Sequence, residues 1–199
     1  MTNTKLTVRF FGLCSLVLAG ALFSGCAWKN ETSKYMTASL NVPASPPAGK
    51  ALVCIHRPSA PAGHSLYYAG IWDDMKFIAD LGNANSVAYV CEPGRHYLLS
   101  LFPGETSCVE AQLLPDKTYD LWIDTAGVFA TFKLKPLHQD DKTRRRVANW
   151  IQQDRWIEPA SPAAAYEQAK QDKIRQLLED FTSGKLQDKL QHLAPDDHR

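Results

Sequence analysis

Between residues 50 and 137, short stretches of alternating apolar and polar side chains follow one another, separated by turn residues. In the clearest two, 108–114 and 118–124, every second side chain is apolar: Val109, Ala111 and Leu113, then Tyr119, Leu121 and Ile123. A period of two places one face of a strand in a core and the other in water. Similar stretches occupy 51–57, 66–72, 75–81, 86–92, 95–102 and 128–134. Short strands with a turn every ~8–12 residues predict a mainly β fold, an antiparallel β-sandwich of about seven strands.

Two of the predicted strands, 86–92 and 95–102, flank Pro93-Gly94, a dipeptide that is typical of a hairpin turn. Together with 108–114 they would form a simple meander. Cys91 and Cys108 would then lie at opposite ends of strands about seven residues long, at ~3.3 Å per residue. Because a disulfide needs Cα atoms within roughly 7 Å, we predict no bridge between them.

Residues 138–199 are charged and show the period of helices. One helix is predicted over 142–156 and a last short one around 186–193. Between them, Ser161-Pro162 is typical of a helix start, and Gly184 of its end. The apolar stripe of this middle helix must be covered, either by the chain's own sheet or by a partner protein. Its candidate partner-binding side chains are Tyr166, Ile174, Leu177, Leu178 and Phe181.

The start of the chain has the layout of an export signal. Lys5 and Arg9 precede an uncharged, mostly apolar run at 10–23. That run fits a signal peptide and is short for a membrane span, which needs about twenty residues. Ordinary secretion, with cleavage near 19–21, and an uncleaved anchor are the alternatives to the interpretation that follows.

The apolar run ends in Leu22-Phe23-Ser24-Gly25-Cys26, which resembles the lipobox of bacterial lipoproteins, with Phe23 where Leu is usual. The resemblance implies that residues 1–25 are a signal peptide and that acylated Cys26 anchors the mature protein in a lipid bilayer. Ala27, in place of Asp, resembles the sorting choice for the outer membrane, facing the periplasm. Residues 26–49, which contain Pro43, Pro46 and Pro47, would then form a flexible tether spanning roughly 25 Å.

The net charge is close to zero. It is formally +1 for the chain and −1 once residues 1–25 are removed, since 20 basic and 21 acidic side chains remain. No overall field would therefore attract nucleic acid. The roughly 150 residues after the tether suffice for one domain with a core of its own, which we place at 50–137, followed by the helical extension at 138–199.

Three short motifs in the β region resemble a family of uncharacterised bacterial lipoproteins. They are Gly49-Lys50-Ala51-Leu52-Val53 with Arg57-Pro58-Ser59, then Glu92-Pro93-Gly94-Arg95-His96, then Leu114-Pro115-Asp116-Lys117-Thr118-Tyr119, with Asp116 where Gly is usual. The resemblance covers roughly residues 49–135 and leaves the helical third outside. It implies a small transthyretin-like or carboxypeptidase-regulatory-like β-sandwich, and it implies no catalytic residues.

Cys54 and His56 are two residues apart on a predicted strand, so their side chains face the same way. Such a pair could bind copper or zinc if two further ligands approached, and His64 and His96 are the candidates. The simpler interpretation is a small apolar cysteine and a strand-end histidine that makes a hydrogen bond. No G-x-S-x-G sequence marks a hydrolase. We therefore predict no metal, no cofactor and no catalytic residue.

Trp122 falls between Asp120 and Asp124 on the face predicted to be wet, so its ring needs a partner. That partner is either the C-terminal helix or a ligand. These features favour a membrane-anchored periplasmic lipoprotein with a non-catalytic protein-binding or structural role. A glycan- or peptidoglycan-binding module that uses Trp122 is the first alternative. A metal-binding or hydrolytic envelope protein is the second.

Overall fold

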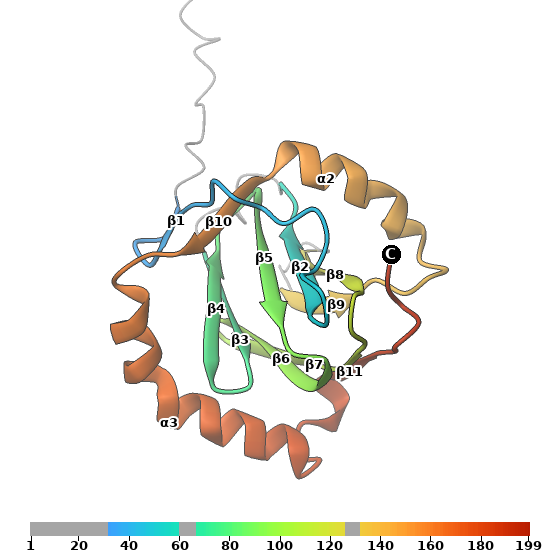
Figure 1. Cartoon of the computed structure of the whole chain (residues 1–199). Coiled ribbons are helices and arrows are strands. Elements are labelled where there is room, and N and C mark those ends of the chain that lie inside the picture. Colours follow the sequence, from blue (N-terminus) through green and yellow to red (C-terminus); the bar gives the residue numbers. More distant parts are fainter. Residues whose placement is uncertain (1–31, 60–66, 126–131) are drawn as a thin grey trace, which may run out of the picture.

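The computed structural model describes residues 32–59, 67–125 and 132–199, and in these ranges two β-sheets face each other (Figure 1). The six-stranded sheet has the order β1 (Met36–Ala38), β10 (Arg155–Pro159), β5 (Asn85–Cys91), β2 (Ala51–Arg57), β8 (Thr118–Asp124), β9 (Lys133–Pro136). The five-stranded sheet has the order β11 (Leu190–Leu193), β7 (Glu105–Leu113), β6 (Gly94–Phe102), β3 (Ala69–Asp73), β4 (Lys76–Leu81). The predicted mainly β, sandwich-like fold is confirmed.

The alternation read from the sequence sorts side chains between the core and the outer faces. Tyr119, Leu121 and Ile123 of β8 are fully buried in the main core, whereas Trp122 is half-buried on the other face. Burying one such apolar side chain contributes roughly 1.5–3 kcal/mol, so these positions strongly determine the register of β8. All seven residues of β2 are buried, because the outer face of this strand is also covered.

The sheets are mixed, and the prediction of a purely antiparallel sandwich was wrong. β2 pairs in parallel with β8, β10 with β5, and β11 with β7. Two of these parallel pairs arise because the C-terminal third of the chain returns to both sheets and adds one strand to each. Parallel pairing needs a long crossover connection, and the helical segments around residues 142–189 supply two of them.

Pro93-Gly94 does not close a hairpin. β5 and β6 belong to different sheets, so the chain crosses from one sheet to the other at this dipeptide, and the predicted meander was wrong. The hairpin lies one turn later, at Pro103-Gly104, where Phe102 pairs with Glu105 and Gly104 has a φ of +82°. Cys91 and Cys108 therefore lie in different sheets, and both thiols are buried and free.

The helical third is less helical than predicted. The 142–156 segment forms a short 3-10 helix, η3 (Lys142–Arg146), and α2 (Val147–Gln153), and then turns into strand β10. The long helix α3 (Ala163–Thr182) begins just after Pro162, as the sequence predicts within one or two residues. The 186–193 segment is a single 3-10 turn, η4 (Gln187–Lys189), followed by strand β11 rather than a helix.

Strand pairing crosses two of the predicted domain boundaries. β1 lies inside the segment 26–49, where it pairs with β10, and Ser33 donates a 2.6 Å hydrogen bond to buried Asp80. Residues from Ser33 onward therefore contact the sandwich. In the segment 138–199, β10 and β11 add one strand to each sheet. The signal peptide and Cys26 lie outside the described residues.

Candidate functional site

Helix α3 folds back on the five-stranded sheet and covers its own apolar stripe (Figure 1). Ile174 and Phe181 are at most 1% exposed, and the other three candidates pack partly buried against the same core: Tyr166, Leu177 and Leu178. The chain's own sheet is thus the cover for this stripe. Of the five side chains predicted to bind a partner, Ile174 and Phe181 are therefore buried, whereas Tyr166, Leu177 and Leu178 keep part of their surface exposed.

Polar contacts fix α3 to the β3–β4 hairpin as well. A carboxylate oxygen of Glu167 accepts from the backbone N–H of Phe77 at 3.0 Å, and the Gln171 amide donates to the carbonyl of Met75 at 3.0 Å. The Tyr166 ring stacks on Tyr35 with a centroid separation of 4.3 Å. α3 is therefore an integral layer of the domain.

Trp122 packs against α2 and not against the C-terminal helix α3. Its ring stacks on Trp150 with centroids 5.6 Å apart and an interplanar angle of 25°. Trp150 is 5% exposed, so the pair covers the outer face of the six-stranded sheet over β8. The Trp122 ring is thus half-buried, with part of its surface covered by the protein itself.

Beneath α2 lies a buried polar network centred on His56. Its Nδ1 is 2.8 Å from the Ser86 hydroxyl, which donates to an Asp154 carboxylate oxygen at 2.7 Å. Its Nε2 is 3.3 Å from the carboxylate of Asp120. Serine, histidine and aspartate thus meet, but His56 and Ser86 are fully buried, so no substrate reaches them. The network ties β2, β5, β8 and the end of α2 together.

Cys54 lies beside this network and is sealed by the last residue of the chain. The Arg199 guanidinium reaches 3.4 Å from the Cys54 sulfur and 3.5 Å from Asp120. Burial raises the pKa of the Cys54 thiol to about 12, so at neutral pH it is a protonated, unreactive side chain. Among the described residues, Cys54 and His56 do not belong to a group of three donor side chains close enough to share a metal ion, and His64, their predicted co-ligand, lies outside those residues.

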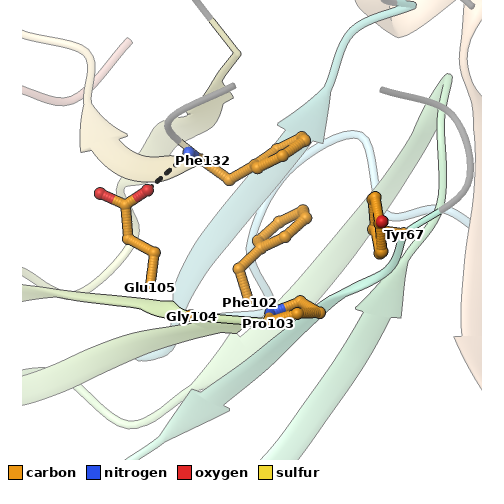
Figure 2. A pocket seen from close by; sticks show the side chains of 6 residues that line it. All are labelled: Tyr67, Phe102, Pro103, Gly104, Glu105 and Phe132. Atoms are coloured by element: carbon orange, nitrogen blue, oxygen red, sulfur yellow. Dashed lines mark hydrogen bonds between the residues drawn. The ribbon is translucent and has the colours of Figure 1, made fainter. Parts of the chain in front are cut away.

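An aromatic pocket opens at the end of the sandwich where β3 begins and β6 ends (Figure 2). Its volume is about 360 Å³, within the range of small ligand sites. Its walls come from three separate parts of the chain: Tyr67, then Phe102, Pro103, Gly104 and Glu105, then Phe132. The Phe102 and Phe132 rings stack face to face with centroids 3.8 Å apart and an interplanar angle of 8°. Tyr67 stands across from them and is 49% exposed.

The stacked rings rest on the buried guanidinium of Arg57. Its central carbon lies 5.3 Å from the Phe102 centroid and 5.5 Å from the Phe132 centroid. One guanidinium nitrogen donates to the carbonyl of Leu81 at 2.6 Å and also to the carbonyl of Tyr67. Burial lowers the pKa of Arg57 to about 10, so it remains charged at neutral pH. A cation under the rings fixes them in place and gives the pocket a rigid base.

Glu105 places the negative charge at the rim of the pocket. One carboxylate oxygen accepts from the backbone N–H of Phe132 at 3.0 Å, which joins the β6–β7 turn to the start of β9 (Figure 2). The pocket thus presents ring carbons inside and a carboxylate at its edge. Sequence patterns did not single it out, because residues 57, 67, 102 and 132 are distant in the chain. The sequence feature that could have indicated the pocket is Arg57, a charged residue at the end of the apolar strand 51–57.

A second cluster, the His96 cluster (Asp73, Asp74, Tyr89 and His96), lies at the opposite end of the sandwich. The Nδ1 atom of His96 is 2.9 Å from both carboxylate oxygens of Asp73, and its Nε2 atom is 2.9 Å from the carbonyl oxygen of Glu92. The Tyr89 hydroxyl donates to Asp73 at 2.8 Å. Donor atoms of Asp73, Asp74 and His96 lie within 4.8 Å of one another, the spacing of a cation site. Both ring nitrogens are nevertheless engaged, so the cluster has no free imidazole ligand.

The chain matches no family model, no curated protein and no solved structure. Its resemblance to bacterial lipoproteins therefore rests on the short motifs named above, and remains a prediction. Within the described ranges, no helix combines the length and the apolar composition required to cross a bilayer.

Proposed function

We propose that this protein is a lipid-anchored lipoprotein of the bacterial cell envelope whose non-catalytic role is to bind another envelope protein through the aromatic pocket. The observation that carries the proposal is the pocket itself, in which two stacked phenylalanine rings and a half-exposed tyrosine surround about 360 Å³. Apolar pockets with few polar groups are the usual form of binding sites. The proposed partner-binding site is therefore the aromatic pocket, in place of the helix α3 that the sequence suggested.

Binding rather than catalysis is supported by the state of the polar groups. The His56 network is buried under Trp150, and in the His96 cluster Asp73 is used by its own neighbours. At the pocket, Glu105 is the acidic lining residue, and one of its carboxylate oxygens is bonded to the backbone. A general acid–base mechanism needs a group within reach of a bound substrate, and usually a partner group to orient it.

The lining indicates the chemistry of the partner. Ring carbons favour an aliphatic or aromatic side chain, and the Glu105 carboxylate at the rim favours a basic residue beside it. Buried aromatic anchors of this kind dominate the binding energy of many protein interfaces. We therefore take the occupant to be an apolar side chain of a protein segment that carries Lys or Arg next to it.

The anchor part of the proposal rests on the lipobox-like segment that ends in Cys26. Ser33, which bonds to Asp80 of the sandwich, is seven positions after Cys26, so an extended chain between them spans at most ~25 Å. Acylation at Cys26 would hold the sandwich close to one membrane face, which Ala27 suggests to be the outer membrane. Labelled palmitate should enter the wild-type protein and not Cys26→Ser, and equal labelling of both would contradict the anchor.

Site-specific cross-linking tests the binding role. A photoreactive amino acid at Leu114, which is 38% exposed and lines no described pocket, serves as a control for one placed at Tyr67. The Tyr67 probe should capture a discrete envelope protein in intact cells, and the Leu114 probe should not. Phe132→Asp should abolish that capture, because it places a carboxylate among the rings. Identical products from both probes would contradict the pocket as the site.

The structure gives less support to a glycan-binding role than the sequence did, because the Trp122 ring packs against Trp150. Tyr67 is the ring that still faces solvent at the pocket. Sedimentation with purified peptidoglycan separates the two classes of partner. Pelleting that is lost in Tyr67→Ala would replace the protein partner by a glycan.

A further inference from the structure

The His96 cluster contains more hydrogen-bond acceptors than a neutral imidazole can serve. The carbonyl of Glu92 can only accept, so His96 Nε2 must carry a proton to bond to it at 2.9 Å. Asp73 accepts from the Tyr89 hydroxyl at 2.8 Å, as an ionised carboxylate does. It also faces His96 Nδ1 at 2.9 Å through both oxygens, so that nitrogen must donate as well. With Asp73 in the ionised form that is usual for a carboxyl group at neutral pH, only the imidazolium form satisfies both contacts.

The two contacts of His96 together join the two sheets. His96 lies in β6, next to β3, so its contact with Asp73 at the end of β3 is made within the five-stranded sheet. Its contact with Glu92, which directly follows β5, reaches the end of the six-stranded sheet. The His96 side chain is 12% exposed. The chain crosses between the sheets at Pro93-Gly94, so the two contacts hold the crossing segment against the end of β3, where the Asp74 N–H also donates to the Tyr97 carbonyl of β6 at 3.0 Å.

We propose that His96 is a proton-dependent link between the sheets, which holds the crossing segment 92–95 while its imidazole is charged and releases that segment when the ring loses a proton. Loss of the Nδ1 proton would set a lone pair against the Asp73 carboxylate. Loss of the Nε2 proton would set one against the Glu92 carbonyl. Either loss removes one of the two bonds and leaves a repulsive contact in its place.

The surrounding charges support the charged ring. The Asp73 hydrogen bond raises the pKa of His96 above its usual value, against the opposing effect of burial, and the carboxylates of Asp73 and Asp74 add to the rise. On β5, Tyr89 and Cys91 stay neutral, because burial raises the pKa of both groups, that of Cys91 to about 12. The Nζ atom of Lys76, on β4, lies 4.9 Å from the centroid of the Tyr89 ring. The guanidinium of Arg95 lies over the Tyr97 ring.

The sign of the pH effect follows from the raised pKa of His96. An unfolded histidine titrates near pH ~6.5, so the link contributes its full stability below that pH. The contribution falls as the pH rises through the higher pKa of the folded protein. Alkaline conditions should therefore loosen the crossing segment, whereas mildly acidic conditions should hold it.

Ring-nitrogen NMR of the full-length chain in detergent tests the link directly. At pH 6.5, both nitrogens of His96 should carry protons, and this state should persist to higher pH than it does in the urea-unfolded protein. Amide exchange at residues 92–95 should speed up as His96 deprotonates, beyond the ordinary base-catalysed rise seen elsewhere in the protein. The wild-type folding equilibrium constant should also fall with rising pH by a larger factor than that of His96→Gln, and His192→Gln should follow the wild type.

Three results would overturn the proposal. One is a singly protonated His96 ring at pH 6.5 in the wild-type protein, a measurement that does not depend on any variant folding. The second is amide exchange at 92–95 that does not follow the titration of the ring. The third is a shift of the His96 signals by equimolar Zn²⁺ that a chelator reverses, since the bridging cation would then be a metal ion and not a proton.

Discussion

The two ends of the sandwich are held together in opposite ways. At the pocket end, one buried cation, Arg57, lies under two phenylalanine rings and donates to backbone carbonyls. At the other end, an ion pair between Asp73 and His96 joins β3 to β6, and His96 also contacts the carbonyl of Glu92 at the end of β5. The guanidinium keeps its charge across the physiological range, whereas the imidazole does not. The difference teaches that one end is built to keep its shape, while the other can respond to pH.

The largest expected effect is at the pocket end. Arg57→Met should destabilise the domain by about 3 kcal/mol, because it leaves the carbonyls of Leu81 and Tyr67 without their buried donor. Urea unfolding measures the change. Arg95→Met is the matched control, since Arg95 is exposed over the Tyr97 ring, and it should cost less than about 1 kcal/mol. Equal losses in both variants would remove Arg57 as the support of this end.

Asp73→Asn tests the polar end and should cost about 2 kcal/mol, because it removes the charge that both Tyr89 and His96 contact. The loss should be greatest below pH ~6.5, where the wild-type ring is charged, and should shrink as the pH rises. Unfolding free energies across that range measure it. A loss that is independent of pH would show that the ion pair makes no special contribution.

Tyr89→Phe should have a smaller effect, about 1 kcal/mol, because it removes one donor from Asp73 and leaves the ring in place. The pH dependence should persist, since His96 keeps both of its acceptors. Comparison with Asp73→Asn thus separates the neutral hydrogen bond from the ionic one. If the unfolding free energy of Tyr89→Phe did not depend on pH, the Tyr89 hydroxyl would be what keeps Asp73 ionised.

The smallest change in stability is expected for Tyr67→Ala, less than about 0.5 kcal/mol, because the side chain is 49% exposed. The Tyr67 carbonyl that Arg57 uses belongs to the backbone and is retained. This variant should therefore keep its melting temperature and lose partner capture. A large drop in melting temperature would assign Tyr67 to the structure of the pocket end rather than to binding.

The sequence predicts strands best where their apolar pattern is unbroken. β2 and β8 have the predicted bounds, because β2 begins with a continuous apolar run and ends before Pro58, and β8 alternates without interruption. β10 and β11 were not predicted. Arg155–Pro159 is short and follows a helix directly, and Leu190 and Leu193 have a helical spacing of three. Their strand conformation comes from pairing with β5 and β7, which no local pattern contains.

The candidate site was less predictable than the fold. The pocket joins residues 67, 102 and 132, and the His96 cluster joins residues 73, 89 and 96. Each residue taken alone is an ordinary strand-end side chain. Trp122, by contrast, was predictable to the extent that it needed a partner, since a tryptophan between two aspartates is unusual on a wet face. The sequence could not decide between Trp150 and a ligand, because that depends on where α2 packs.

The place of β1 at the edge of the six-stranded sheet has a mechanical consequence. β1 joins the sheet through β10, by the three residue pairs from Met36–Pro159 to Ala38–Ile157, and Ser33 and Tyr35 add side-chain contacts to Asp80 and Tyr166. A pull on the chain from its N-terminal side therefore loads segments that lie more than a hundred residues further on, before it reaches the central strands. The β1–β10 pairing and the packing of α3 would break first, and the core between β2 and β6 would be shielded from the force.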